Sequence, residues 1–285
     1  MKIVNFEQGS EEWLTWRKGR LTATDAAALL GKSRYVTPYK AWQRKIGQAP
    51  EQIVTDAMRR GQRDEPIARD LFIKEYGINM VPACIESETY NFLGASLDGL
   101  SDCGEILLEV KSQHPVEHIP EDHMCQMQHA MLTSDGRIKK AYYVSHWEGR
   151  NTVFEAYPDK NWQDFYIYQA REFWKRIVFF DAPPLSSRDY RDMSSKEDWN
   201  VLASEYLRVE NDLKKLEEAK ASLKSSLINM CEDQSSMGSG IKVIKKLSKG
   251  RIDYKEACEL LNIREDQLEH YRKEPSSTWA IMIDR

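Results

Sequence analysis

The chain contains the stretch Gly94-Ala-Ser-Leu-Asp-Gly-Leu100, followed after a short polar break by Ile106-Leu-Leu-Glu-Val-Lys111. The break, residues 101–104, has the composition of a turn, and the second stretch begins with three apolar residues. Two short apolar runs joined by a turn predict a β-hairpin. Glu109 and Lys111 stand two residues apart, so both side chains point to the same face of the second strand.

This hairpin brings two carboxylates, Asp98 and Glu109, near the ammonium group of Lys111. Oxygen ligands on rigid strands can bind a hard cation such as Mg²⁺. An ammonium group beside a metal can hold or deprotonate a water molecule that attacks a phosphate. The alternative is a solvated strand with an ordinary Glu–Lys ion pair, and a D…ExK pattern by itself does not exclude it. The residues around the hairpin therefore have to decide between the two interpretations.

Composition places the chain among folded proteins. Its 285 residues include eight Trp and thirteen Tyr at a hydrophobic content of 41 %, which is enough for one large domain or for one domain plus an appendage. No apolar run approaches the ~18–20 residues of a membrane span. The N-terminus also lacks the apolar core of a secretory signal. We therefore expect a cytoplasmic protein without a membrane partner.

Cysteine usage and net charge exclude further classes. The five cysteines are scattered and form no CxxC, which argues against a disulfide framework, a zinc knuckle and an iron–sulfur cluster. The formal net charge is −4. A DNA-binding protein of this charge needs a local positive potential, because its net charge does not attract phosphate.

Periodicity predicts a mixture of helices and strands up to about residue 180. The expected helices are 10–17, a second one from about 24, 53–76, 119–132 and 159–180. The expected strands are 78–81, 92–97, 106–111, 141–145 and 152–156. Ala182-Pro-Pro184 ends this part, and a polar stretch follows. We therefore expect a domain at 1–185, a linker at 186–198 and a C-terminal region at 199–285.

The C-terminal region has a different sequence character. Apolar residues recur at steps of three and four along about four heptads, and only Lys220 interrupts them. They are Trp199, Leu202, Tyr206, Val209, Leu213, Leu216, Leu223 and Leu227. Such a seam predicts a long helix that pairs with another helix. After Gly238-Ser-Gly240, a basic hairpin is expected from 241–247 and 251–254, before a short helix at 254–261.

Glu65 lies in an unusual place on the helix expected at 53–76. The apolar positions of this helix recur every three or four residues, and Glu65 falls within their stripe, directly before Pro66. A buried carboxylate is costly unless a charge or a metal compensates it, which favours a site residue. Alternatively, Pro66 marks a helix start, and Glu65 belongs to a first turn stabilised by the helix dipole. The segment alone leaves both interpretations open.

The N-terminal block contains a candidate anion pocket. Thr24 precedes the apolar run 26–30 and is expected to be the N-cap of a helix. Free amides at a helix start, a hydroxyl group and the nearby Arg17 can together bind a phosphate. Simple helix capping by Thr24 is the alternative.

Gln126 and Gln128 lie on the helix expected at 119–132. Periodicity puts Gln128 near the apolar face of that helix and Gln126 on the opposite side. One of the two is a candidate to reach a metal-bound water molecule or a phosphate. Ordinary helix polarity is the alternative.

Three histidines, His114, His118 and His123, invite a zinc interpretation. The spacing His114-x-x-x-His118 contains Pro115 and does not lie on a regular helix. Histidines in a loop or facing DNA are the simpler interpretation.

Taken in order, these motifs resemble the lambda exonuclease and YqaJ-type viral recombinase family of PD-(D/E)xK nucleases. The resemblance covers about residues 8–180, and five blocks in the family's order are far more specific than D…ExK alone. The blocks are Trp13…Arg17-x-x-x-Leu-Thr-Ala-Thr24, Arg60-Gly61-x-x-x-Glu65, Ser96-Leu-Asp98-Gly, Glu109-x-Lys111 and Gln126-x-Gln128.

The resemblance implies a fold and an activity. The fold would be an α/β (α+β) restriction-endonuclease-like core, a central mixed β-sheet flanked by helices, plus the C-terminal long helix and small basic hairpin. The activity would be 5′→3′ digestion of linear double-stranded DNA with two Mg²⁺ ions per site, for which Mn²⁺ would substitute. The products would be 3′ single-stranded tails for the annealing recombination of a phage in a bacterial host cell. The implied partners are DNA ends, further copies of the chain in a trimeric ring, and a single-strand annealing protein.

The resemblance also implies roles for single residues of the hairpin. Asp98 and Glu109 would be metal ligands, with the Val110 carbonyl as a third. Lys111 would position or deprotonate the nucleophilic water. Glu65 would complete the site through the second metal ion or its waters.

Three more residues receive roles in the same way. Gln126 would lie beside the metal site, and Arg17 and Thr24 would recognise the 5′-terminal phosphate. The chain departs from the family pattern at two positions. Thr24 stands where serine is usual, which keeps the hydroxyl group, and Leu97 stands where proline precedes the aspartate.

Two rival functions remain at this point. The first is an endonuclease of the same superfamily, of a restriction or repair type. The second is a catalytically silent protein that binds DNA ends or recruits a partner through the heptad helix. The intact set of Asp98, Glu109 and Lys111 argues against the second.

Overall fold

The computed structural model describes residues 1–6, 9–49, 54–246, 250, 254–261 and 263. The chain forms two compact units, Met1–Tyr190 and Arg191–Arg285. None of the helices in the described part of the chain combines the length and the hydropathy that a membrane span requires.

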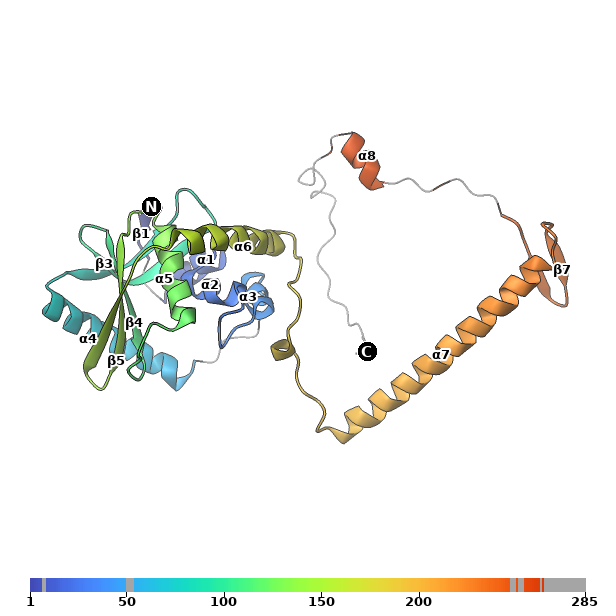
Figure 1. Ribbon diagram of the computed structural model, residues 1–285, viewed down its shortest axis with the longest axis horizontal. Helices are drawn as coiled ribbons and strands as arrows, with labels where there is room; N and C mark the ends of the chain where they lie inside the picture. The colour runs from blue at the N-terminus through green and yellow to red at the C-terminus, as the bar shows by residue number, and fades with distance from the viewer. Residues whose placement is uncertain (7–8, 50–53, 247–249, 251–253, 262, 264–285) are drawn as a thin grey trace. The chain divides into compact units, whose positions relative to one another are not determined.

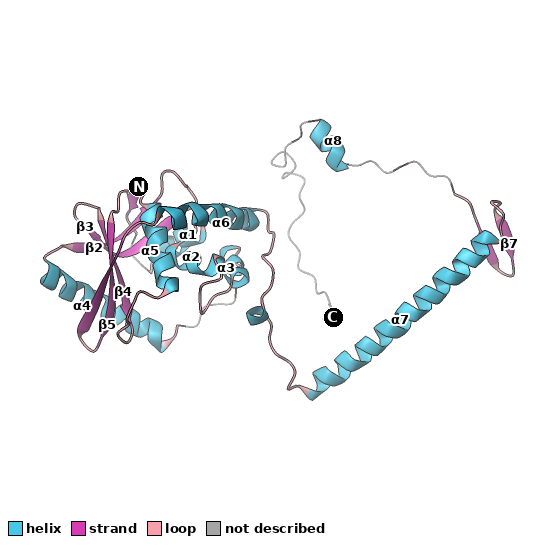
Figure 2. Cartoon of the chain, in the orientation of Figure 1, coloured by secondary structure: helices cyan, strands magenta, loops and turns pink. Residues whose placement is uncertain are grey.

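A six-stranded sheet forms the centre of the first unit (Figure 1). Its strands are β1 (Lys2–Val4), β2 (Met80–Glu86), β3 (Gly94–Ser101), β4 (Ile106–Ser112), β5 (Lys140–Trp147) and β6 (Arg150–Ala156). They lie in sequence order, and all neighbours are antiparallel except β4 and β5. A parallel pair needs a crossover, and helix α5 (Glu121–Thr133) lies within it. The predicted mixed sheet flanked by helices is confirmed (Figure 2).

Helices cover both faces of the sheet. Besides α5 they are α1 (Glu11–Lys18), α2 (Ala23–Leu29), α3 (Pro38–Lys45), α4 (Asp56–Tyr76) and α6 (Lys160–Val178). On one face, Phe72 of α4 packs with Leu108 and Val110 of β4. On the other face, Met127 of α5 packs with Leu107 of β4. Successive β4 residues therefore face α4 and α5 in turn, as the strand period requires.

Glycines allow two close local arrangements in and beside the sheet. The β5–β6 hairpin turns at Glu148 and Gly149, with φ values of 49° and 73°, as a two-residue primed turn requires. At Gly94, an added Cβ would come within 2.9 Å of Arg20 Cδ and of the Trp16 ring. Glycine therefore allows the segment after α1 to pack directly on β3.

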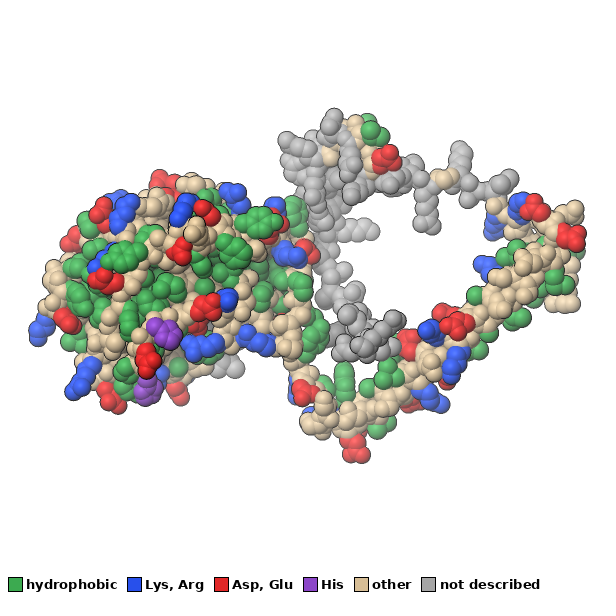
Figure 3. All heavy atoms as spheres, viewed as in Figure 1, with side chains coloured by type: hydrophobic (Ala, Val, Ile, Leu, Met, Phe, Trp, Pro, Cys, Tyr) green, Lys and Arg blue, Asp and Glu red, His purple; other side chains and the backbone are tan. Residues whose placement is uncertain are grey.

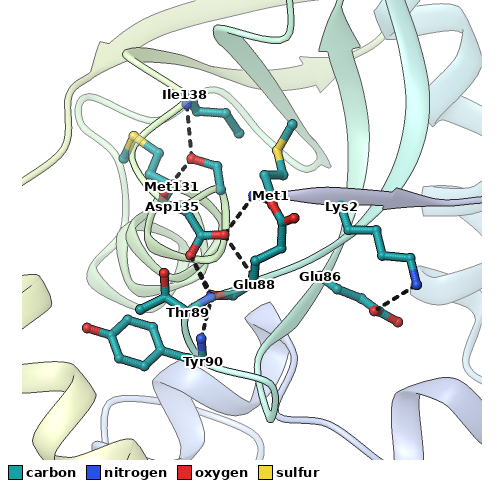
Figure 4. A network of polar contacts seen from close by, with 11 residues as sticks. Met1, Lys2, Glu86, Glu88, Thr89, Tyr90, Met131, Asp135 and Ile138 are labelled. Atoms are coloured by element: carbon teal, nitrogen blue, oxygen red, sulfur yellow. Dashed lines mark hydrogen bonds and ion pairs between the residues drawn. The ribbon is translucent and has the colours of Figure 1, made fainter.

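A polar network joins β1 to the loop after β2 and to the end of α5 (Figure 4). The Asp135 carboxylate lies 2.7 Å from the Met1 amino group and accepts hydrogen bonds from Ser87 Oγ at 2.6 Å and the Glu88 amide at 2.8 Å. The Met1 amino group also pairs with Glu88. This network fixes the short strand β1 to the sheet.

The first unit extends into the predicted linker of 186–198. A short 3₁₀ helix, Ser187–Asp189, follows α6. Arg188 donates to the carbonyl of Ser33 at 3.0 Å and to that of Arg34 at 2.7 Å. These bonds attach the segment to the loop before α3.

The second unit contains α7 (Glu197–Asn229), β7 (Ser236–Gly238), β8 (Ile241–Val243) and α8 (Tyr254–Leu260). The hairpin differs from the predicted one, because 241–243 pair with 236–238 and Tyr254 begins a helix. The turn is Ser239-Gly240, with φ values of 46° and 80°, so these residues reverse the chain instead of only breaking a helix. Residues 247–249 and 251–253 of the predicted hairpin lie outside the described residues.

Candidate active site

Strands β3 and β4 separate at the middle of the sheet. Their paired residues are Gly99 with Leu108 and Leu100 with Leu107. One residue beyond this ladder, the Asp98 side chain takes the place of a strand partner, and its Oδ2 accepts the Val110 amide at 2.7 Å. We call this place, where Asp98 of β3 faces Val110 of β4, the β3–β4 gap. In it, a carboxylate of one strand contacts the backbone of the other.

Glu109 and Lys111 lie on the face of β4 that α5 covers, because they alternate with Val110 on the α4 face. The Lys111 ammonium is 2.5 Å from Glu109 Oε1, and the Glu109 side chain is buried. Burial lowers the pKa of Lys111, but the charges of Glu109 and Asp98 outweigh it, so its pKa is raised. Lys111 is therefore a fixed cation beside Glu109.

The Asp98 carboxylate is electrostatically strained. Burial raises its pKa well above the usual range, the charge of Glu109 raises it further, and Lys111 compensates only in part. Glu65 adds a third negative charge nearby. The gap therefore carries more carboxylate charge than the surrounding protein neutralises.

Glu65 reaches this gap from α4. The helix begins after its N-cap Thr55, so Glu65 lies well inside it, and the interpretation of a first-turn glutamate at a helix start is wrong. Pro66 stands inside the helix. Arg69 Nη1 donates to Glu65 Oε1 at 3.0 Å and to the Asp98 carbonyl at 2.7 Å. Arg69 therefore fixes the Glu65 carboxylate to the backbone of Asp98.

Arg69 was not among the residues that the sequence singled out. Its only signal is the position four residues after Glu65, where a helical ion pair can form. The same spacing is common on exposed helices, so it does not indicate a site by itself.

Arg17 and Thr24 lie together beside α1 and α2. Arg17 Nη2 donates to Thr24 Oγ1 at 3.1 Å, and the guanidinium lies 4.5 Å from the centre of the Trp13 ring. Thr24 is not the N-cap as predicted. Thr22 is the N-cap, and its amide and hydroxyl donate to Asp25 at 2.7 and 2.8 Å. Because Thr22 and Asp25 form the cap, the Thr24 hydroxyl is left to face Arg17.

Lys45 of α3 binds the backbone next to this pair, and the sequence analysis did not identify it. Its buried ammonium donates to the carbonyl of Arg17 at 2.8 Å, to that of Arg20 at 2.5 Å and to Asp25 at 2.7 Å. The Asp25 carboxylate loses solvation by burial, but Lys45 and Thr22 more than compensate, and its pKa is lowered. No spacing signals this lysine, because its partners come from two other helices, α1 and α2, and from the loop between them.

A cleft lies between α1 and α4, which carry residues of the two groups. It has a volume of about 530 Å³, and its lining includes Trp13, Glu65 and Arg69. Trp13 also donates through Nε1 to Ser96 Oγ at 3.0 Å, two residues before Asp98 on β3. The cleft is therefore lined by Trp13, which contacts Arg17, and by Arg69, which contacts the backbone of Asp98.

The two glutamines of α5 have separate surroundings. Gln128 donates to the Tyr157 carbonyl at 2.7 Å and accepts the Asp159 amide at 2.9 Å, so it holds the start of α6. Gln126 lies three residues from His123 and from His129, which contact Tyr143 of β5 and Gly94 of β3. Helical spacing therefore directs Gln126 toward the sheet between these strands.

The three histidines considered for zinc lie in different surroundings. His123 is buried, with Nδ1 2.8 Å from the Tyr143 hydroxyl, and burial followed by the charge of Lys111 lowers its pKa to about 4. His114 packs on Trp147 at 3.9 Å between ring centres, and His118 is exposed.

The described residues contain no group of three or more His, Cys, Asp or Glu side chains that could hold a metal ion. The β3–β4 gap instead offers the carboxylates of Asp98 and Glu109 and the carbonyl of Val110, which faces the same neighbour as its amide. Hard oxygen donors of this kind suit Mg²⁺ or Mn²⁺. The uncompensated charge on Asp98 also favours a cation, so these residues fit a divalent metal ion.

The fold is that of a known exonuclease. The alkaline exonuclease LHK-Exo from Laribacter hongkongensis superposes with a TM-score of 0.52 at 22 % sequence identity, over 60 % of this chain and 94 % of that chain. The same values hold for a crystal structure of LHK-Exo in complex with dAMP.

Sequence comparison finds a domain match in the N-terminal part. Residues 12–137 match the YqaJ-like viral recombinase domain. YqaJ of Bacillus subtilis (strain 168), an uncharacterized protein, is 26 % identical over 223 residues, which cover 73 % of this chain and 67 % of that protein. The resemblance predicted from the motifs is confirmed by this match over residues 12–137.

The two glutamines allow a matched test. Gln128→Ala is expected to lower the free energy of unfolding by ~1–3 kcal/mol, because it removes two hydrogen bonds, to the Tyr157 carbonyl and from the Asp159 amide. Gln126→Ala is expected to change it by less than ~0.5 kcal/mol and to slow DNA digestion. Urea denaturation and a digestion assay on both variants check this. A Gln126→Ala variant with unchanged digestion would remove Gln126 from the site.

Proposed function

We propose that this protein is a Mg²⁺-dependent 5′→3′ exonuclease that digests linear double-stranded DNA and leaves 3′ single-stranded tails for annealing recombination. The observation that carries the proposal is the convergence of Asp98, Glu109, Lys111 and Glu65 on the β3–β4 gap. The YqaJ-like viral recombinase domain supports it. So does the fold shared with an alkaline exonuclease that has been crystallised with a nucleotide.

The residues of the gap divide the chemistry between them. A metal ion would be held by Asp98, Glu109 and the Val110 carbonyl, with Glu65 serving a second ion. Bound divalent ions supply an activated water molecule and stabilise the leaving 3′ oxygen, and Mn²⁺ is expected to replace Mg²⁺. Lys111 holds Glu109 in place and, as a fixed cation, orients the attacking water and the phosphate.

The remaining residues would position the substrate. Arg69 holds Glu65 against β3, and Gln126 approaches the site from α5. Arg17 and Thr24, next to Trp13, would bind the 5′-terminal phosphate through charge-assisted hydrogen bonds. Recognition of that phosphate would give the enzyme its 5′→3′ direction.

The proposal includes an assembly. The net charge of −4 gives no bulk attraction to DNA, so a trimeric ring around the duplex would explain how the protein stays on it. In this arrangement the first unit, Met1–Tyr190, forms the nuclease, and residues 199–285 are available for other contacts, among them a single-strand annealing protein.

A comparison of linear and closed circular plasmid tests the function. The full chain with Mg²⁺ is expected to release nucleotides from linear duplex and to leave the closed circle intact. Nicking or linearisation of the circle would assign it to the endonucleases instead. DNA-end binding without any release of nucleotides would make it a non-catalytic binding protein.

Arg17→Ala is expected to abolish the preference for phosphorylated over dephosphorylated 5′ ends. A charge-assisted hydrogen bond contributes ~1.5–3 kcal/mol, which corresponds to a preference of about 10–100-fold. Initial rates on the two kinds of end measure it. Lys18→Ala removes an exposed positive charge next to Arg17 and is expected to keep the preference. An unchanged preference in Arg17→Ala would contradict the phosphate role.

A further inference from the structure

Helix α7 carries a long apolar seam that the described structure leaves uncovered. The helix has 33 residues, and none of them is buried. With Trp199 at heptad position a, the seam occupies every a and d position up to Met230 except Lys220. Its side chains stay open to solvent, for example Leu216 with 68 % and Leu223 with 66 % of the side chain exposed. Hydrophobic side chains are visible along this helix in Figure 3.

A seam of this kind needs a partner helix. Apolar a and d positions sustained over more than four heptads pack as knobs into the holes of a facing helix. The flanking positions e and g then decide which helix fits and in which direction. In α7 the charged residues at positions e and g are acidic up to Glu217, and the last one is Lys224.

The charges disfavour parallel pairing of two copies. In a parallel pair, Lys220 at position a would lie opposite Lys220 of the other copy. Position g of one helix would also meet position e of the next heptad in the other, which opposes Glu205 to Glu210 and Asp212 to Glu217. All three contacts join like charges, and no attractive contact balances them.

Antiparallel pairing removes the three conflicts of the parallel pair and adds attractive contacts. The first half of α7 is acidic, with Glu205, Glu210 and Asp212 on its flanks, and the second half carries Lys220 and Lys224 with one acidic flank residue, Glu217. Reversing one copy places each acidic half against a basic half. In the register that opposes Glu210 to Lys224, this ion pair forms twice, and Lys220 faces an apolar d position instead of itself. One like-charge contact remains, because Glu217 then lies opposite Glu217 of the other copy, and the two attractive pairs outnumber it.

A groove at the end of α7 fits the same arrangement. It lies between the last turns of the helix and the β7–β8 hairpin and has a volume of about 1190 Å³. Leu223, Leu227, Ile241 and Val243 are among its lining residues. In the antiparallel register, Val209 of the other copy comes opposite Leu227 and its Tyr206 opposite Met230. The apolar start of one helix therefore enters the groove at the end of the other.

We infer that α7 is a self-association surface, which pairs with α7 of a second copy of this chain in an antiparallel coiled coil with Glu210 opposite Lys224. Each such contact joins two chains. It is independent of the nuclease site and would link two rings if the first unit forms a ring.

Mass measurement on the full chain without DNA tests the surface. The wild-type assembly is expected to contain an even number of chains, and Leu216→Asp is expected to halve its mass. Leu207→Asp is the matched control, because Leu207 is an exposed leucine of the same helix outside the seam, and it is expected to keep the mass. Circular dichroism verifies that both variants retain their helix. A monomeric wild type, or an unchanged mass in Leu216→Asp, would overturn the inference.

Charge reversal tests the direction and the register. Glu210→Lys and Lys224→Glu are each expected to raise the dissociation constant about tenfold or more, because each turns two attractive pairs into repulsive ones. The double variant is expected to restore the wild-type value. Failure of the double variant to recover would overturn the antiparallel arrangement. Since DNA digestion is not the readout, a failed nuclease assignment would leave this result unaffected.

Discussion

Lys111→Ala is expected to lower the rate of linear duplex digestion by about 10²–10⁴-fold, the usual range for a group that directs proton transfer or charge in a transition state. Lys111 is the fixed cation on β4, 2.5 Å from Glu109. Without it, Glu109 loses its partner, and the attacking water loses the group that orients it. The binding of DNA is expected to change much less than the rate, because the Arg17–Thr24 pair is untouched.

Lys140→Ala provides the matched control. Lys140 lies on β5, the strand next to β4. Like Lys111, it forms an ion pair with a glutamate, here Glu155 at 2.5 Å. It pairs with Ile106 at the opposite end of β4 from Lys111. Single-turnover digestion of an end-labelled duplex is the measurement. Equal rates for wild type and Lys111→Ala would exclude the proposed site, while an equal loss in Lys140→Ala would point to a general effect on the fold.

The parts of the site that follow local rules could be predicted from the sequence. The strand period alone places Glu109 and Lys111 on one face, and the helix period places Glu65 in the apolar stripe of α4. The turn at residues 101–104 follows from its composition, and the sheet built on it is confirmed. Each of these features depends on residues that lie close together in the sequence.

The supporting contacts could not be predicted, because they join distant segments. Arg69 binds the backbone of Asp98, 29 residues away, and Lys45 binds the carbonyl of Arg17, 28 residues away. Only the packing of α4 and α3 on the rest of the unit creates these pairs. The error at the start of α2 is of another kind, since Thr22 followed by Asp25 is itself a capping signal that outweighs Thr24.

Asp98→Asn is expected to abolish metal-dependent digestion without lowering the thermal stability of the metal-free protein. The pKa of Asp98 is raised in the folded state by burial and by Glu109. A raised folded-state pKa means that the protonated carboxyl favours folding at low pH. This contribution is lost as the pH rises from the unfolded value toward the raised one. Asparagine mimics the neutral form, and its side-chain oxygen can still accept the Val110 amide.

Asp64→Asn is the matched control, because the pKa of Asp64 is shifted in the opposite direction to that of Asp98. The hydrogen bond from Ser112 lowers the pKa of Asp64, so its carboxylate stabilises the fold above the unfolded pKa, and its loss is expected to lower Tm. Thermal melts at neutral pH, with and without Mg²⁺, measure both variants. Mg²⁺ at 100 times its Kd stabilises a protein by about 2.7 kcal/mol, so it is expected to raise Tm of the wild type and of Asp64→Asn but not of Asp98→Asn. A Mg²⁺ shift that survives in Asp98→Asn would place the metal ion elsewhere, and a lower Tm of metal-free Asp98→Asn would mean that the charge on Asp98 does not strain the fold.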